Sequence, residues 1–228
     1  MVERIIVGPL YTNTYILSTG KKECLLIDPG AEADKICARL ESLNLIPQAI
    51  LCTHGHLDHT AAAPRIQNHY LTEREHSVPI GIHPGDVRFF GADAVRHHHD
   101  CFTPLGRQAV AVFEQLRDGI PTASFEIKIG EPIFESDLVA LETPGHTPGS
   151  ICFYSETRAV VFSGDTLLFK SVGRTDLGES SADDLVKSIS SQLFPLPPET
   201  RLFPGHGPFS SIEREKRNNP LLDGERTF

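Results

Sequence analysis

The stretch Thr53-His54-Gly55-His56-Leu57-Asp58-His59-Thr60 gathers three imidazoles and one carboxylate within six residues. Packing of an apolar core does not require such a density of polar side chains. His54 and His56 are separated by one residue, so in an extended loop both can face one ion. Asp58 and His59 follow and can face a second ion beside the first. Neutral imidazole and carboxylate are ligands that Zn²⁺, Mn²⁺ and iron accept. The stretch therefore predicts a metal-binding loop, with a histidine-rich surface loop as the alternative.

Three further segments share one design, in which a short apolar strand is followed by a Gly or Pro turn and then by a ligand-type side chain. These side chains are His146 after Leu138–Thr143, Asp165 after Ala159–Ser163, and His206 after Arg201–Phe203. The loop at 53–60 follows the apolar run Gln48–Thr53 in the same way. Ligands at strand ends can converge on one edge of a sheet, where rigid strands hold them. The four segments together favour a metal centre over a surface loop.

In this order, His54-x-His56-x-Asp58-His59, His146, Asp165 and His206 resemble the metallo-β-lactamase superfamily, and the match spans most of the chain. The resemblance implies an αββα sandwich with a dinuclear metal site between its two sheets. It also implies a ligand set. The first metal would be held by His54, His56 and His146, the second by Asp58, His59 and His206, and Asp165 would bridge both.

The order of the expected elements agrees with this α/β fold class. Strands and a helix come first, then more helix, then strands and a helix again. Strands are expected at Glu3–Val7, Tyr11–Ser18, Glu23–Ile27, Gln48–Thr53, Pro79–His83, Ser124–Ile129, Leu138–Thr143, Ser150–Tyr154, Ala159–Ser163 and Arg201–Phe203. Such an order suits two mixed β-sheets flanked by helices, a four-layer αββα sandwich. No linker composition divides the chain, so we expect a single domain over residues 1–228.

Within the superfamily, the chain is most similar to glyoxalase II-type thioester hydrolases (hydroxyacylglutathione hydrolases). The similar runs are Thr143–Ser150, Ser163–Phe169 and Ser171–Asp176, the last in the form found in short bacterial members. The long enzymes have a Glu-Tyr pair after the last histidine ligand, where this chain has Gly207-Pro208. They also have a C-terminal helical domain that contributes to glutathione binding, and we expect the chain to lack it.

Arg174 falls where that group has a basic residue near the glutathione carboxylate, and the resemblance makes it a candidate substrate contact. An ion pair with an acidic residue such as Asp176 is an equal alternative.

The resemblance implies hydrolysis of S-2-hydroxyacylglutathione, such as S-lactoylglutathione, to glutathione and a 2-hydroxy acid. Two divalent ions that share a water lower its pKa toward about 7 and so supply hydroxide at neutral pH. Asp58 is the candidate catalytic residue that orients this hydroxide. The ions are expected to be zinc, with iron or manganese also compatible with the ligands. The alternative is an oxidoreductase, because persulfide dioxygenases with a single iron share the Gly-Arg-Thr-Asp run at 173–176.

Composition restricts the partners and the compartment. The net charge of −9 argues against a nucleic-acid partner. Neither a signal peptide nor an apolar run long enough for a membrane helix is visible. The five cysteines are scattered and include no Cys-x-x-Cys pair, which favours a reducing compartment and hence the cytoplasm.

His97-His98-His99 is followed by Asp100 and Cys101 and looks like another metal cluster. Consecutive side chains point in different directions and chelate one ion poorly. The cluster is interpreted as an exposed or lid segment, with an auxiliary metal site or a substrate contact as the alternative.

Overall fold

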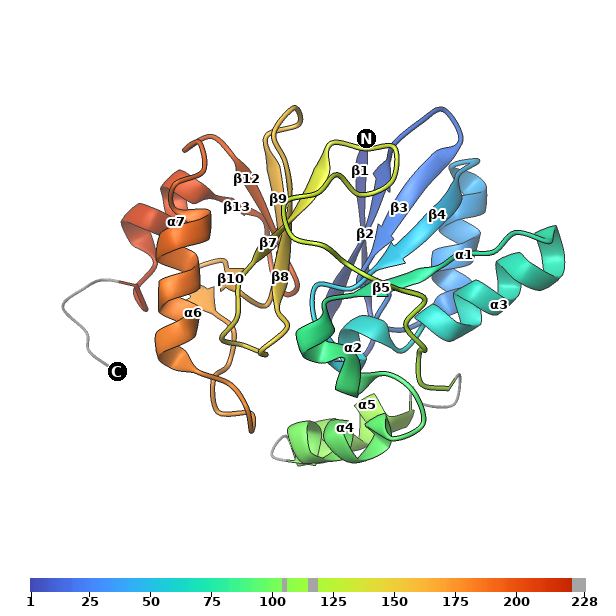
Figure 1. Cartoon of the computed structure of the whole chain (residues 1–228), viewed down its shortest axis with the longest axis horizontal. Coiled ribbons are helices and arrows are strands. Elements are labelled where there is room, and N and C mark those ends of the chain that lie inside the picture. The colour runs from blue at the N-terminus through green and yellow to red at the C-terminus, as the bar shows by residue number, and fades with distance from the viewer. Residues whose placement is uncertain (104–105, 115–118, 223–228) are drawn as a thin grey trace. The chain divides into compact units, whose positions relative to one another are not determined.

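The computed structural model describes residues 1–103, 106–114 and 119–222 (Figure 1). The chain divides into two compact units, Met1–Ile127 and Lys128–Phe228. Within the described ranges, no helix has the length and apolar character needed to cross a lipid bilayer.

The first unit contains a six-stranded mixed sheet in the order β1-β2-β3-β4-β5-β6. The first three strands pair antiparallel, and the pairs from β3 to β6 are parallel. The strands are β1 (Val2–Val7), β2 (Thr12–Ser18), β3 (Glu23–Ile27), β4 (Ile46–Leu51), β5 (Ile80–Ile82) and β6 (Phe125–Glu126). Because β3 and β4 are parallel, their carboxyl ends lie side by side, and Asp28 N donates to Leu51 O at 3.0 Å. The metal loop begins at this edge of the sheet.

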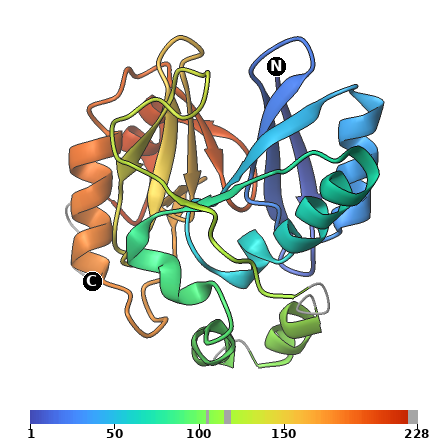
Figure 2. The same ribbon diagram turned by 45° about the vertical axis from the view of Figure 1, so that its right-hand side comes forward.

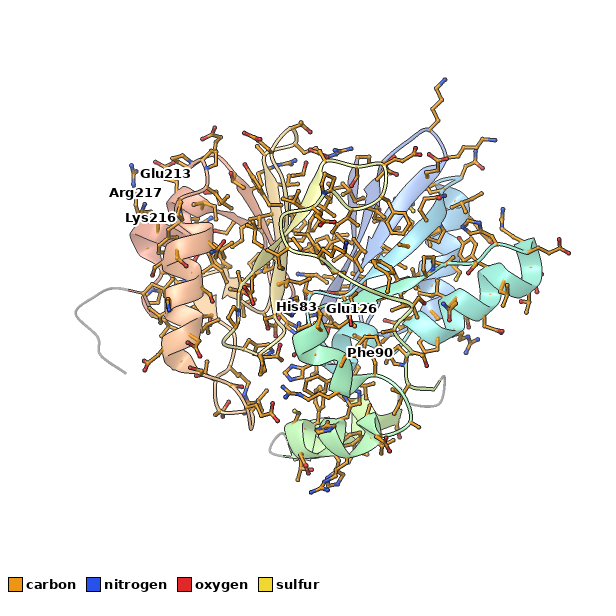
Figure 3. The ribbon with its side chains drawn as sticks, viewed as in Figure 1. His83, Phe90, Glu126, Glu213, Lys216 and Arg217 are labelled. Atoms are coloured by element: carbon orange, nitrogen blue, oxygen red, sulfur yellow. The ribbon has the colours of Figure 1, made fainter. Side chains whose placement is uncertain are left out.

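The helices of the first unit are α1 (Ala33–Ser42), α2 (Leu57–Thr60), α3 (Ala63–Arg74), the 3₁₀ helix η1 (Pro84–Phe89), α4 (Ala94–Phe102) and α5 (Arg107–Phe113). Figures 1 and 2 show α1 and α3 side by side against this sheet. Ile36 and Leu40 of α1 and Ile66 and Tyr70 of α3 are buried in one core cluster with residues of the strands. His83, labelled in Figure 3, begins η1 by accepting a hydrogen bond from Gly85 N at 3.3 Å.

The second unit contains a five-stranded mixed sheet in the order β13-β12-β9-β8-β7 and a separate hairpin of β10 and β11. Only the β12–β9 pair of this sheet is parallel. The strands are β7 (Leu138–Glu142), β8 (Ile151–Ser155), β9 (Val160–Gly164), β10 (Leu167–Leu168), β11 (Ser171–Val172), β12 (Arg201–Pro204) and β13 (Ser210–Ser211). The expectation of two mixed sheets with flanking helices is confirmed.

Two helices pack on the second sheet, α6 (Ala182–Ser188) and α7 (Ile212–Asn218). A π-helical turn over Ile189–Leu193 extends α6. Ser181 caps α6, since its hydroxyl accepts from Asp184 N at 3.2 Å. Figure 2 shows α6 running along one face of this sheet. Apolar residues of both helices share a core cluster with β8, β9 and β12.

Candidate metal centre

The predicted metal loop, residues 53–60, follows β4 and includes α2 in the first unit, and its four ligand-type residues come together. The ring centroid of His54 lies 4.8 Å from that of His56 and 4.2 Å from that of His59. Nε2 of His59 lies 3.6 Å from Oδ2 of Asp58. All four side chains are buried. Helix α2 begins directly after His56 and so fixes the direction in which Asp58 and His59 leave the backbone.

Asp28, at the carboxyl end of β3, contacts two residues of this loop, Thr53 and His59. Its Oδ1 accepts from Thr53 N at 2.8 Å, and its Oδ2 accepts from Thr53 Oγ1 at 2.7 Å. The same Oδ2 lies 3.0 Å from Nδ1 of His59. An ionised carboxylate only accepts, so Nδ1 of His59 carries the proton and Nε2 keeps its lone pair for a metal. Sequence reasoning missed this role; an Asp directly after a buried strand that runs beside the metal-loop strand was the available signal.

Two close contacts place Asp58. Thr12 Oγ1 donates to Oδ2 of Asp58 at 3.2 Å. A Cβ added to Gly30 would lie 1.6 Å from the carbonyl oxygen of Asp58, so only glycine permits this approach of the two backbones. The catalytic candidate is therefore held at both its backbone and its side chain.

The 3₁₀ helix η1 contacts the loop at Gly55 and His56. Gly55 N donates to Oδ2 of Asp86 at 2.7 Å. The Phe89 side chain fills the space where a Cβ of Gly55 would stand, 2.4 Å from its Cδ2. The Phe89 ring also meets the ring of His56 edge-on, with centroids 5.4 Å apart, and Phe102 of α4 packs on the same imidazole at 5.7 Å.

The His97-His98-His99 cluster lies on α4 and divides into different roles. His98 is fully buried, and its Nε2 donates to the carbonyl of Phe89 at 2.8 Å. Burial lowers the pKa of His98 to about 4, so its ring is neutral. His99 is exposed and stacks on Phe113. The expectation of an exposed segment is therefore wrong for His98, which links α4 to the phenylalanine that packs on His56.

In the second unit, two of the predicted ligands, His146 and His206, lie beside the third, the carboxylate of Asp165. Oδ2 of Asp165 lies 3.7 Å from Nε2 of His146 and 3.5 Å from Nε2 of His206. Nδ1 of His146 donates to the carbonyl of Arg174 at 2.8 Å, which again leaves Nε2 for a metal. A Cβ on Gly173 would lie 1.9 Å from the carbonyl oxygen of Asp165 and 3.1 Å from Cγ of His146.

These distances fit metal ligands better than ordinary hydrogen bonds. Nitrogen and oxygen 3.5 to 3.7 Å apart are too far for a good hydrogen bond. Two atoms that each lie about 2.1 Å from one tetrahedral ion are roughly 3.4 Å apart. Histidine ligands also characteristically donate their second ring N–H to a carboxylate or carbonyl, as His59 and His146 do. The donor sets of both units therefore fit divalent metal ions.

Arg174 forms the ion pair that sequence reasoning left as an alternative. Its Nε and Nη2 donate to the two carboxylate oxygens of Asp176 at 2.8 and 2.9 Å. These hydrogen bonds lower the pKa of Asp176 and raise that of Arg174. Both side chains are exposed, so solvent can compete for the pair.

Comparison with known proteins gives a coherent set of relatives. The family model described as the metallo-beta-lactamase superfamily matches residues 7–206. The probable metallo-hydrolase YqgX of Bacillus subtilis (strain 168) is 33% identical, over 97% of each chain. The hydroxyacylglutathione hydrolase GloC of Haemophilus influenzae is 31% identical, over 98% of this chain and 99% of its own length.

Solved structures agree. The BLEG-1 B3 metallo-beta-lactamase is 31% identical with a TM-score of 0.79, over 98% of this chain and all of its own. TTHA1623 in a di-iron-bound form is 35% identical with a TM-score of 0.74, over 96% of this chain and all of its own. ETHE1 from Myxococcus xanthus is 27% identical with a TM-score of 0.71, over 98% of this chain and 85% of its own. The fold class predicted from the sequence is confirmed by these likenesses.

Proposed function

The chain belongs to the metallo-β-lactamase superfamily, and from this premise we propose that it hydrolyses a thioester of glutathione. The substrate is S-2-hydroxyacylglutathione, such as S-lactoylglutathione, and the products are glutathione and a 2-hydroxy acid. One observation carries the proposal. In each unit a histidine donates Nδ1–H to a protein oxygen and keeps Nε2 beside a carboxylate. Similarity to GloC, whose name is hydroxyacylglutathione hydrolase, supports the substrate.

We propose that the two units act as one domain and that their ligands form one dinuclear centre. The first ion would be held by His54, His56 and His146, the second by Asp58, His59 and His206, and Asp165 would bridge both. Zinc is the proposed ion. Iron and manganese suit the same ligands, and the di-iron form of TTHA1623 is a reason to include iron in every assay.

Bound divalent ions would supply a water of lowered pKa and would polarise the thioester carbonyl. The chain itself orients the reactants. Asp58 is the proposed positioning carboxylate for the attacking water, because Thr12 Oγ1 holds its Oδ2 and Gly30 fixes its backbone. Asp28 keeps the proton of His59 on Nδ1, and the Arg174 carbonyl does the same for His146.

The test of this function compares metal-loaded chain with the same protein after chelation. Turnover of S-lactoylglutathione, followed by release of the free thiol, is expected in the loaded protein. It is expected to disappear with the chelator and to return when metal is added back. A coenzyme A thioester in the same assay separates the reaction class from the thiol carrier. A fully loaded protein that hydrolyses neither thioester contradicts the proposal.

Arg174 is the proposed anchor for a glutathione carboxylate, and Asp176 then competes with the substrate for it. Replacing Asp176 by Asn is expected to lower KM for S-lactoylglutathione about threefold, the scale of one exposed ion pair. Replacing Arg174 by Gln is expected to raise KM about tenfold, because a charge-assisted hydrogen bond is lost. Neither change is expected to alter kcat.

A thioester without carboxylates is the control for this pair, since its KM should not respond to either substitution. A rise in KM on replacing Asp176 would mean that the ion pair orients Arg174 rather than competing with the substrate.

The second candidate function is a persulfide dioxygenase with a single iron. It is favoured by the Gly-Arg-Thr-Asp run at 173–176, and the likeness to ETHE1 fits it equally. Anaerobic loading with iron distinguishes the two functions. Oxygen uptake with glutathione persulfide at one iron per chain supports the dioxygenase, whereas two bound ions and thioester turnover support the hydrolase.

We further propose that the chain works in the cytoplasm on a small molecule, without nucleic-acid or membrane partners. No disulfide joins the five cysteines, all of which lie in the described ranges, and this suits a reducing compartment.

A further inference from the structure

Helix α7 has a buried polar side that the proposed function does not use. Ile212, Glu215 and Asn219 are buried at helical spacing. Glu213, Lys216 and Arg217 lie on the exposed side, as Figure 3 shows. A carboxylate that is only 1% exposed is costly unless donors surround it. The partners of Glu215 therefore indicate what this side of the helix does.

Glu215 and Asn219 hold the turn between β10 and β11. Oε2 of Glu215 accepts from Lys170 N at 2.8 Å and from Nδ2 of Asn219 at 3.0 Å, and Oε1 accepts from the Ser210 hydroxyl. Nδ2 of Asn219 also donates to the carbonyl of Ser171 at 3.0 Å. Two backbone groups of adjacent hairpin residues, Lys170 N and Ser171 O, are thus bound by one pair of buried side chains.

The turn needs such support. Lys170 has a φ of 53°, in the left-handed region that non-glycine residues rarely adopt. The guanidinium of Arg214, the residue before Glu215 in α7, lies over the Phe169 ring at 4.5 Å from its centroid. Helix α7 and its C-cap residue Asn219 therefore contact three consecutive residues of the hairpin, 169 to 171.

Both ends of this hairpin lead directly into the candidate metal centre. Asp165 stands two residues before β10, and Arg174 stands two residues after β11. The Arg174 carbonyl is the acceptor that orients His146. The backbone at Gly173 is pressed against both Asp165 and His146, since an added Cβ would overlap the first and crowd the second. A shift of the hairpin along α7 would move this acceptor and turn the imidazole.

We propose that Glu215 and Asn219 are positioning residues for the metal centre, acting through the β10–β11 hairpin on His146 and Asp165. The inference rests on the proposed function, because it assumes that these residues bind metal. Loss of the partners that orient metal ligands typically weakens metal binding 10- to 100-fold. Since Glu215 acts through the Arg174 carbonyl, we expect the lower part of that range.

The test uses the full chain and Co²⁺ as the metal. Glu215 accepts from three donors, namely Lys170 N, Asn219 Nδ2 and the Ser210 hydroxyl. Replacing Glu215 by Gln puts an NH₂ group, which cannot accept, opposite one of them. The expected result is a Co²⁺ dissociation constant raised about tenfold in competition with a chelator, together with a shift of the visible d–d absorption bands. Replacing Glu213 by Gln is the matched control. It lies on the exposed side of the same helix and should change neither readout.

A lower unfolding midpoint with unchanged Co²⁺ affinity and spectrum would overturn the inference, because α7 would then only stabilise the unit. If the Glu215 variant does not fold, replacing Asn219 by Ala decides. This change removes the bond to the Ser171 carbonyl and leaves Glu215 bound to Lys170 N and Ser210. An Asn219 variant with unchanged Co²⁺ affinity and an unchanged spectrum would also overturn the inference. Neither readout uses a thioester, so a failure of the proposed substrate leaves this result standing, whereas a wild-type chain that binds no Co²⁺ refutes both.

Discussion

Replacing Asp165 by Ala is expected to lower thioester turnover about 10³-fold while the chain stays folded. As the proposed bridging ligand, Asp165 would contribute to the binding of both ions. Its Oδ2 lies 3.7 Å from Nε2 of His146 and 3.5 Å from Nε2 of His206. A bound ion contributes several kcal/mol of transition-state stabilisation, and about 1.4 kcal/mol corresponds to tenfold in rate. Metal content per chain and turnover of S-lactoylglutathione are measured on the same sample, with near-UV circular dichroism to confirm the fold.

Asp183 provides the control for this change. It is an exposed carboxylate in the first turn of α6, and its replacement by Ala should affect neither metal content nor turnover. An Asp165 variant that retains two ions per chain and full turnover would be incompatible with a bridging role.

Replacing Asp28 by Ala is expected to have the largest effect on stability, although Asp28 is not a proposed ligand. The change removes the acceptor of Thr53 N and of Nδ1 of His59 in a buried site, and it leaves Thr53 Oγ1 with Nδ1 of His54, 3.1 Å away, as its remaining neighbour. Each unsatisfied buried donor costs about 1–3 kcal/mol, so we expect the free energy of unfolding of the metal-free chain to fall by about 3–5 kcal/mol. Metal affinity should also fall about 10- to 100-fold.

Urea unfolding of the metal-free chain measures the first effect, and metal competition below the unfolding transition measures the second. Asp34, an exposed acid on α1 paired with Arg65, is the comparison residue, and its loss should cost less than about 1 kcal/mol. If the Asp28 variant loses stability but binds metal as tightly as the wild type, the carboxylate does not orient His59.

The sequence revealed the residues whose chemistry has no other explanation. A run such as 53–60 has more imidazoles than a surface loop needs, and the turns before His146, Asp165 and His206 repeat its design. Within each unit the structure brings these residues together. Asp28 was missed because Asp-Pro-Gly after a strand is also an ordinary turn signal. Its function depends on the parallel neighbour β4, which sequence spacing does not show.

The supporting residues were harder to identify for related reasons. Leu167–Val172 is too short for strand periodicity to predict the β10–β11 hairpin. Glu215 stands in a charged segment and looks like any solvated carboxylate until the helix is seen to bury it. His98 belongs to a run of three histidines, and only the packing of α4 distinguishes the buried ring from its exposed neighbour.

The contact of α7 with the hairpin has a thermodynamic consequence. If Glu215 and Asn219 favour the arrangement of His146 and Asp165 that binds metal, then bound metal must favour the docked position of α7 by the same free energy, because linkage between two equilibria is reciprocal. Helix α7 would then report metal occupancy, although it contains none of the proposed ligands. Metal supply in the cell would set not only the activity of the protein but also how firmly α7 is attached to the rest of its unit.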